Sequence, residues 1–300
     1  QENVVDTLDR LGAAYQSVGK DGEAIKAYDR GLGIIKEAGL KTPIEGKLYV
    51  GLGEVYLGQK DFPRARENLN RALKIGERLQ DATVIQLAST QIGNLFLQTQ
   101  RPLAAIPYYK KAIDTVESTR SLLESEEFRT SFFEDKRQIY AGIILAHLQA
   151  KNLEVAFNYN ERARSRAFLD ILGSKVQLAK GSTLLEDERT LQAKISILQA
   201  KISATGEEDD DDEDDTPKIP QLKQEQEEAQ KAYNAFLAKV RKENKEQASL
   251  MTVEPLTLKE IQGLLDPGIT LLEYFVVREQ VLLWVVERDR VNFVRLSLNR

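Results

Sequence analysis

Few side chains in this sequence are suited to catalysis. There is no cysteine and one histidine, His147, which excludes a thiolate nucleophile, a thiolate metal site and any metal site built from several histidines. A Ser-His-Asp triad would have to use His147. That residue falls where the repeat described below places a core side chain, so we interpret it as a packing residue. The sequence therefore predicts no catalytic residue, no cofactor and no metal site in this chain.

The most concentrated charge is a run of nine acidic residues at 207–215. Such a run can bind calcium or a basic partner, but this one lacks the glycine and the alternating spacing of an EF-hand loop. Pro217 and Pro220 follow it. We therefore interpret residues 205–219 as a disordered, solvated loop.

A smaller basic cluster comprises Arg162, Arg164, Arg166 and Lys175. Arg162 and Arg166 share a helix face at i, i+4, but Glu161 lies beside them and offsets their charge. The formal net charge is −5, and it becomes +4 when the nine acids of the run are set aside. No broad basic face is indicated, so nucleic-acid binding is kept only as an alternative.

Three stretches of the sequence repeat one pattern of small and aromatic residues. In each, a glycine is followed by an aromatic residue after three positions, an alanine after twelve, and an aromatic residue or leucine after sixteen. Residues three and four apart share a helix face, so the pattern predicts two helices whose small residues allow close packing. The copies contain Gly12, Tyr15, Ala24 and Tyr28; Gly53, Tyr56, Ala65 and Leu69; Gly93, Phe96, Ala105 and Tyr109; and, more weakly, Ile144, His147, Ala156, Asn160 and Ala163.

Short segments rich in glycine, proline and polar residues separate the helices of each copy. Pro63 and Pro102 suit the first turn of a helix, where a missing N–H costs little. Asp81 suits an N-cap. The predicted helices span 3–18, 22–38, 44–57, 61–79, 83–98, 102–119, 128–149 and 152–172.

This pattern resembles the tetratricopeptide repeat (TPR), in which L-G-x-x-Y is followed by further small and aromatic residues at fixed offsets. The usual period is about 34 residues, whereas the glycines here are 41 and 40 residues apart, as in TPRs with long helices. The resemblance implies a mainly α fold in which residues 1–172 form an α-solenoid of about four antiparallel helix pairs. In that family the superhelix presents a groove that holds a peptide or a partner helix.

Seven polar residues of the predicted first helices are expected to face this groove. The Lys, Asn and Arg side chains that grip a terminal carboxylate in chaperone-binding TPRs are not reproduced, and only Asn94 occupies a suitable position. A carboxylate clamp is therefore not expected. The groove candidates are Gln16, Glu54, Thr90, Asn94, Gln98, Gln138 and Gln149.

The pattern changes after Gly173. Residues 183–204 and 221–247 have the composition of two helices on either side of the acidic loop. We therefore predict an antiparallel helical hairpin, with a disordered tip, within residues 173–250.

In the last fifty residues, 251–300, the sequence pattern changes from helical to mainly strand-like. A short helix is expected at 256–265, followed by three strands at 270–277, 281–287 and 291–296 that form a β-meander. These strands are too apolar for a free-standing sheet, and a three-stranded sheet needs a covering layer. We therefore expect the meander to begin a larger α/β domain, which this chain contains only in part.

Three segments resemble CHAT-domain proteins, in which a TPR array precedes a caspase-like or separase-like peptidase domain. Residues 127–133 (EFRTSFF) and 156–170, which include E-R-A-R-S-R-A, resemble the junction before that domain, and 271–275 (LLEYF) resembles its opening. Many members are bacterial, often cyanobacterial. Catalysis in that family uses a His and a Cys in the later part of the domain. This chain has no Cys, so it is expected to be inert by itself, and such catalytic residues would lie beyond it.

Two principal functions follow from these resemblances. The first is a protein–protein interaction scaffold, whose TPR groove binds a peptide or partner helix and positions a C-terminal CHAT-like domain. The alternative is the regulatory N-terminal part of a caspase-like cysteine peptidase, with the groove engaging the chain's own C-terminal domain.

The sequence contains no apolar run near the ~20 residues that span a bilayer, and no signal peptide is seen. We therefore expect a cytoplasmic protein with no membrane span in this chain. Because the first residue is Gln1 and the only methionine is Met251, we also expect that the chain does not begin at its natural start.

Overall fold

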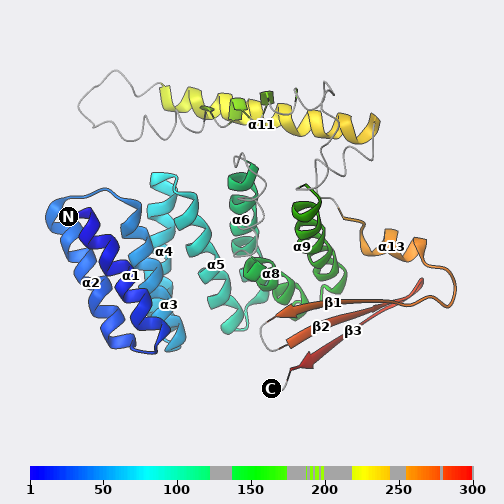
Figure 1. Ribbon diagram of the computed structural model, residues 1–300, viewed down its shortest axis with the longest axis horizontal. Coiled ribbons are helices and arrows are strands. Elements are labelled where there is room, and N and C mark those ends of the chain that lie inside the picture. The colour runs from blue at the N-terminus through cyan, green and yellow to red at the C-terminus, as the bar shows by residue number, and fades with distance from the viewer. Residues whose placement is uncertain are drawn as a thin grey trace. The chain divides into compact units, whose positions relative to one another are not determined.

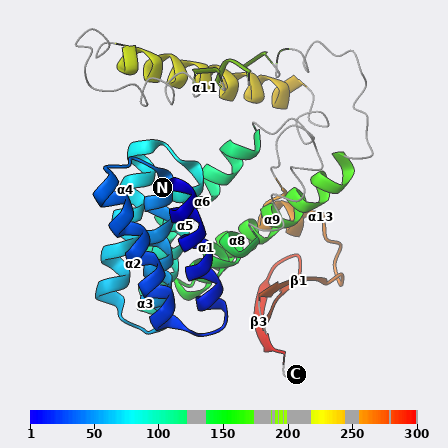
Figure 2. The same cartoon turned by 60° about the vertical axis from the view of Figure 1, so that its left-hand side comes forward.

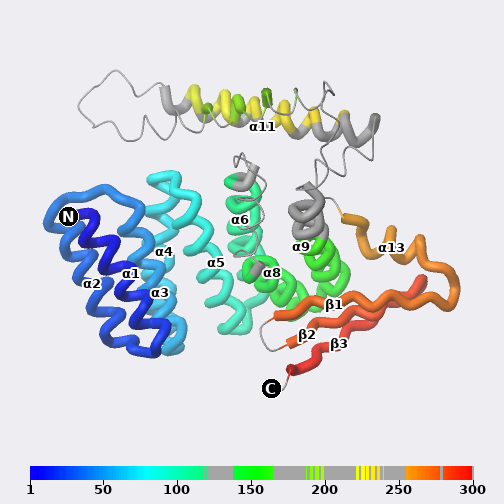
Figure 3. The backbone as a smooth tube through the Cα atoms, viewed as in Figure 1, coloured from blue at the N-terminus to red at the C-terminus, as the bar shows by residue number. Residues whose placement is uncertain are grey.

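The computed structural model describes residues 1–121, 137–173, 218–243, 255–277 and 280–298, with further single residues between 187 and 198. Figure 3 traces the backbone from blue at the N-terminus to red at the C-terminus. The chain divides into two compact units. One comprises Gln1–Glu117, Lys136–Tyr159 and Leu264–Arg300, and the other comprises Ser118–Asp135 and Asn160–Gly263.

The first unit is built on antiparallel helix pairs, followed by a three-stranded sheet (Figure 1). Neighbouring helices along the chain pack together from α1 to α5, and the first helices α1, α3 and α5 also contact one another. The same arrangement is visible after rotation (Figure 2). The pairs are α1 (Glu2–Ser17) with α2 (Asp21–Ala38), α3 (Pro43–Gly58) with α4 (Phe62–Leu79), α5 (Ala82–Gln98) with α6 (Pro102–Ser121), and α8 (Arg137–Gln149) with α9 (Leu153–Gly173). The residues of α6 from Ser118 on and of α9 from Asn160 on belong to the second unit.

These bounds confirm the predicted helices to within one or two residues, apart from 128–149, whose first part lies outside the described residues. The predicted N-cap and the predicted first-turn prolines are found at the starts of helices. Asp81 caps α5, because its Oδ1 accepts a hydrogen bond from the backbone N–H of Val84 at 2.7 Å. Pro63 and Pro102 lie in the first turns of α4 and α6.

The repeated glycines lie at close helix contacts, as predicted. A Cβ on Gly12 would come 2.3 Å from Cε1 of Tyr28, and one on Gly53 would come 2.5 Å from Cδ2 of Leu69. Tyr28 is 2 % exposed and Leu69 is fully buried. The glycines therefore let the second helix of each pair place a large core side chain directly on the backbone of the first.

The turn inside each pair has one geometry throughout. The second residue of each turn is left-handed, and the N–H of the residue after it donates back to the carbonyl of the aromatic or histidine position of the repeat. The left-handed residues are Gly19 (φ 72°), Lys60 (61°), Gln100 (57°) and Lys151 (61°). The bonds are Lys20 to Tyr15 (2.9 Å), Asp61 to Tyr56 (2.9 Å), Arg101 to Phe96 (2.8 Å) and Asn152 to His147 (2.8 Å). The α8–α9 pair, predicted from the weak fourth copy, shares this turn.

The sheet is an antiparallel meander of β1 (Leu271–Val277), β2 (Gln280–Val286) and β3 (Val291–Ser297), preceded by the short helix α13 (Leu258–Leu264). Its strands match the prediction closely. Trp284 lies opposite Glu273 on β1 and Phe293 on β3. Fully buried, the Trp284 ring packs edge-on against Phe157 of α9, with centroids 6.1 Å apart. The face of the sheet that carries Trp284 is therefore buried, and Phe157 of α9 packs against it.

In the second unit the structure describes α11 (Lys218–Glu243), where a helix at 221–247 was predicted. The described positions between 187 and 198 are helical too, within the helix predicted at 183–204. Leu198 and Ala229 are buried. The acidic run 207–215 lies outside the described residues, as do Lys175 and residues 127–133. The hairpin stays a prediction.

Candidate functional site

The first helices carry a hydrogen-bonded network of polar side chains that crosses from α1 to α5. Gln91 of α5 donates through Nε2 to Oε1 of Glu54 on α3, at 2.6 Å. Asn94 donates through Nδ2 to Oε1 of Gln91, at 2.8 Å. On α1, Gln16 makes a further side-chain hydrogen bond with Glu54. We call Gln16, Glu54, Gln91 and Asn94 the first-helix network.

Buried tyrosines from the second helices hold both ends of the network. Tyr109 of α6 donates its hydroxyl to Oδ1 of Asn94 at 2.6 Å. Tyr28 of α2 donates to Oε1 of Gln16 at 3.4 Å. Burial raises the pKa of Tyr28, so it stays a hydrogen-bond donor. Side chains on both helices of a pair are therefore needed to build this face.

Glu54 is the electrostatic centre of the network. Its burial raises the pKa of the carboxyl group, the hydrogen bonds from Gln91 and Gln16 oppose that rise, and the nearby Asp9 adds to it. The pKa of Asp9 is also raised, chiefly by burial, while Lys47 acts to lower it. Within the described residues no cation forms an ion pair with Glu54. A partly desolvated carboxylate is thus held by neutral amides.

The sequence-predicted site residues divide into two groups. Gln16, Glu54 and Asn94 are brought together in the network. Thr90 instead donates to the backbone carbonyl of Gln86 in its own helix, at 2.7 Å. Gln98, Gln138 and Gln149 are exposed near helix ends.

Sequence reasoning missed Gln91, which joins two helix pairs. The signal was its place in the repeat. Gln91 lies two residues before Gly93, and the corresponding residues of the neighbouring copies are Gly51 and Gly142. A long amide side chain thus stands where both neighbouring copies have glycine, although the first copy has Arg10 at this position.

His147 is a core residue, as predicted. It is 8 % exposed, and its ring stacks on Tyr159 with centroids 5.4 Å apart. Burial lowers the pKa of its imidazole. Among the residues that the structure describes, the buried Nδ1 has no hydrogen-bond partner, which suits a neutral packing side chain better than a catalytic base.

The described residues contain no group of three or more His, Asp, Glu or Cys side chains placed to hold a metal ion. In the same parts of the chain, none of the helices combines the length and the apolarity needed to cross a bilayer.

Comparison with protein families gives two matches to tetratricopeptide repeat models, over residues 3–78 and 88–115. Tetratricopeptide repeats occupy this part of the chain. The matched residues include every member of the first-helix network, which therefore lies on the first helices of successive TPRs. TPRs are non-catalytic repeats that indicate protein–protein interaction. No curated protein sequence matches the chain.

Proposed function

We propose that the chain is a protein-interaction scaffold whose first-helix face, on α1, α3 and α5, binds a peptide or a partner helix. The observation that carries the proposal is the position of Glu54. Its carboxylate is partly buried at the middle of this face, amide side chains hold it, and no described cation neutralises it. A ligand that brings a hydrogen-bond donor to Glu54 would replace solvation that folding has removed.

The network also supports binding through pre-organisation. Each of Glu54, Gln91 and Asn94 is fixed by at least one side-chain hydrogen bond, so its rotamer is set before a ligand arrives. Ordering a free glutamine or glutamate on binding costs about 0.5–1.5 kcal/mol per side chain. Repeats stacked in this way offer an extended surface rather than a closed pocket, which suits a chain-like ligand.

The experiment is selection of peptides from a random displayed library on the purified chain, followed by titration of the selected peptides by fluorescence anisotropy. Asn94→Ala combined with Gln98→Ala is expected to weaken binding about tenfold or more, because it opens the network and removes a groove candidate. Glu54→Gln should also weaken it. The matched control is Glu23→Gln, the same change at an exposed position of α2. Selected peptides that bind all variants alike, or a failure to select any, would contradict the proposal.

We further propose that the TPRs position a CHAT-like domain that begins with the β-meander. The sequence resemblance at 156–170 and 271–275 supports this, and so does the sheet. Its second face exposes Leu272 (59 %) and Tyr274 (65 %) on β1, with Val294 and Leu296 on β3. A sheet with one covered and one bare apolar face is suited to further layers of an α/β fold.

The alternative, a regulatory region of a caspase-like cysteine peptidase that binds its own C-terminal domain, rests on the same resemblance. The discriminating observation is the protein sequence beyond Arg300. A His followed by a Cys, each at the end of a predicted strand, would favour the peptidase. A short polar tail would leave the adaptor function alone.

A further inference from the structure

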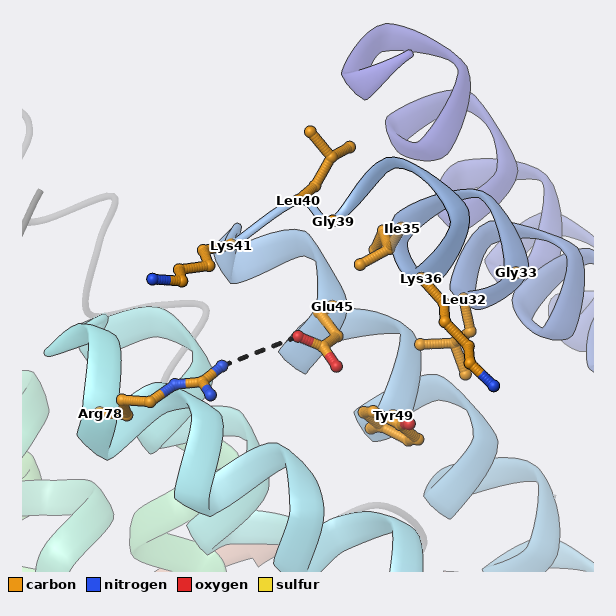
Figure 4. A pocket seen from close by; sticks show the side chains of 10 residues that line it. All are labelled: Leu32, Gly33, Ile35, Lys36, Gly39, Leu40, Lys41, Glu45, Tyr49 and Arg78. Atoms are coloured by element: carbon orange, nitrogen blue, oxygen red, sulfur yellow. Dashed lines mark ion pairs between the residues drawn. The ribbon is translucent and has the colours of Figure 1, made fainter. Parts of the chain in front are cut away.

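A pocket of about 480 Å³ lies where the C-terminal ends of α2 and α4 meet the N-terminal end of α3 (Figure 4). None of its lining residues belongs to the first-helix network. Three of them are cations, namely Lys36 at the end of α2, Lys41 in the α2–α3 turn and Arg78 at the end of α4. One carboxylate, that of Glu45, lies among them. The lining therefore carries an excess of positive charge.

Among the described residues, these three cations form one ion pair, and it is long and exposed on the Arg78 side. Nη2 of Arg78 lies 3.8 Å from Oε2 of Glu45, and the Arg78 side chain is 62 % exposed. Exposed pairs of this kind contribute at most about 1 kcal/mol, so the guanidinium can turn towards another anion at little cost. In the part of the chain that the structure describes, Lys36 and Lys41 form no ion pair. Figure 4 shows their side chains on opposite sides of Glu45.

The pocket also has an apolar wall. Leu32, Leu40 and Tyr49 line it with partly buried side chains, and Ile35 beneath them is 4 % exposed. Cationic ends beside an apolar wall complement a carboxylate that is carried next to an apolar side chain. A simple inorganic anion would use the charges and leave the wall unused.

The turn that carries Leu40 and Lys41 is fixed at both ends. The N–H of Leu40 donates to the carbonyl of Ile35 at 3.1 Å, behind the left-handed Gly39. Thr42 caps α3 through Ile44 and donates to Oε1 of Glu2 at 2.9 Å. The wall and one of the cations are therefore positioned before a ligand binds.

We propose that this pocket is a second binding site, separate from the first-helix face, and that it takes an acidic peptide segment in which Asp or Glu neighbours a large apolar residue. Acidic side chains along the segment pair with Lys36, Lys41 and Arg78, which lie on different sides of Glu45. The apolar side chain lies against Leu40 and Tyr49. Charge complementarity selects the acidic peptide, and the wall distinguishes it from a purely acidic one.

The test uses three fluorescent peptides of equal length in anisotropy titrations against the purified chain. One alternates Asp and Leu with Ser spacers, one replaces Asp by Lys, and one replaces Leu by Ser. The first should bind most tightly, with affinity that falls as salt rises, because the contacts are between exposed charges. The pocket variant is Lys36→Glu with Lys41→Glu. Its control is Lys20→Glu with Lys26→Glu, the same charge change at exposed positions outside the pocket.

The pocket variant is expected to lose about tenfold or more in affinity for the Asp-Leu peptide, and the control to lose much less. Leu40→Ser should weaken the Asp-Leu peptide and leave the Asp-Ser peptide unchanged. Equal losses in the pocket variant and its control would overturn the proposal, because attraction would then follow net charge alone. So would equal binding of the Asp and Lys peptides, or no binding. Loss of binding by Asn94→Ala rather than by the pocket variant would assign the peptide to the first-helix face and overturn the second site.

Discussion

The ring of Tyr28 packs so closely on Gly51 of the next helix pair that a Cβ there would lie 2.4 Å from Cζ of the tyrosine. Gly12 flanks the same ring from within its own pair. Tyr109 is held in the same way, between Gly93 and Gly142. Each tyrosine therefore joins two successive pairs and also supports the polar network through its hydroxyl.

The contact between the middle pair and the pair after it is built from different residues. Leu69 of α4 corresponds to Tyr28 and Tyr109, and Gln91 of α5 corresponds to Gly51 and Gly142, the glycines on which those tyrosines pack. The smaller leucine has no hydroxyl, and the longer side chain on the facing helix supplies the polar group. That group reaches Glu54.

Gly51→Ala is expected to lower the free energy of unfolding by about 1–3 kcal/mol, because the new methyl group overlaps a buried ring. Gly33→Ala is the control. Gly33 is helical, and a Cβ added to it would have no atom of a neighbouring element within 4 Å, so the same change should raise stability by about 0.5–1 kcal/mol. Urea denaturation measures both. Similar effects in the two variants would refute the close contact.

Lys60→Gly should stabilise the protein by about 0.5–1 kcal/mol, because Lys60 holds a left-handed backbone with φ 61° that glycine adopts without strain. Gly19→Ala makes the reverse change in the first turn, at φ 72°, and should destabilise by a similar amount. Thermal unfolding of both variants tests the shared turn geometry. No change in either would mean that the turns relax in solution.

Glu54→Gln should increase stability at pH 7 by on the order of 1 kcal/mol while it weakens ligand binding, because it removes a desolvated charge and keeps an oxygen for Gln91. The folded carboxyl has a raised pKa, so its favourable contribution is full below the ordinary value of 4.5 and is lost as pH rises through the folded pKa. The advantage of the variant should therefore grow from pH 4 to pH 7. A difference independent of pH would argue against burial of the charge.

His147→Phe should protect the protein against mild acid. The folded pKa of His147 is lowered by burial, so the unfolded chain binds the proton first and stability falls as pH drops below about 6.5. Phenylalanine keeps a ring against Tyr159 and cannot be protonated. Denaturation at pH 7.5 and 5.5 should show a smaller loss in the variant, and an equal loss would contradict the buried, neutral histidine.

Trp284 is the sole tryptophan, so its fluorescence reports how the sheet packs on α9. Phe157→Ala removes the ring against which Trp284 lies. It should shift the emission to longer wavelength and cost about 3–5 kcal/mol. Phe62→Ala, at the start of α4, should leave the emission unchanged. An unshifted spectrum in Phe157→Ala would show that this contact does not shield the indole.

The sequence by itself determined the elements of the helix pairs and the meander, since their signals are local. Asp81, Pro63, Pro102 and the glycine–aromatic spacing each act within one or two turns of a helix. The same spacing predicted that Gly12, Gly53 and Gly93 lie at close helix contacts, and the structure shows that Tyr28, Leu69 and Tyr109 fill those contacts.

Only the tertiary structure decided which polar residues share a site. Gln91 and Glu54 are 37 positions apart, and their hydrogen bond depends on how α3 and α5 lie side by side. Lys36, Lys41 and Arg78 meet for a similar reason, at the ends of three helices. Lateral stacking sets such distances, and no local preference of the backbone encodes them.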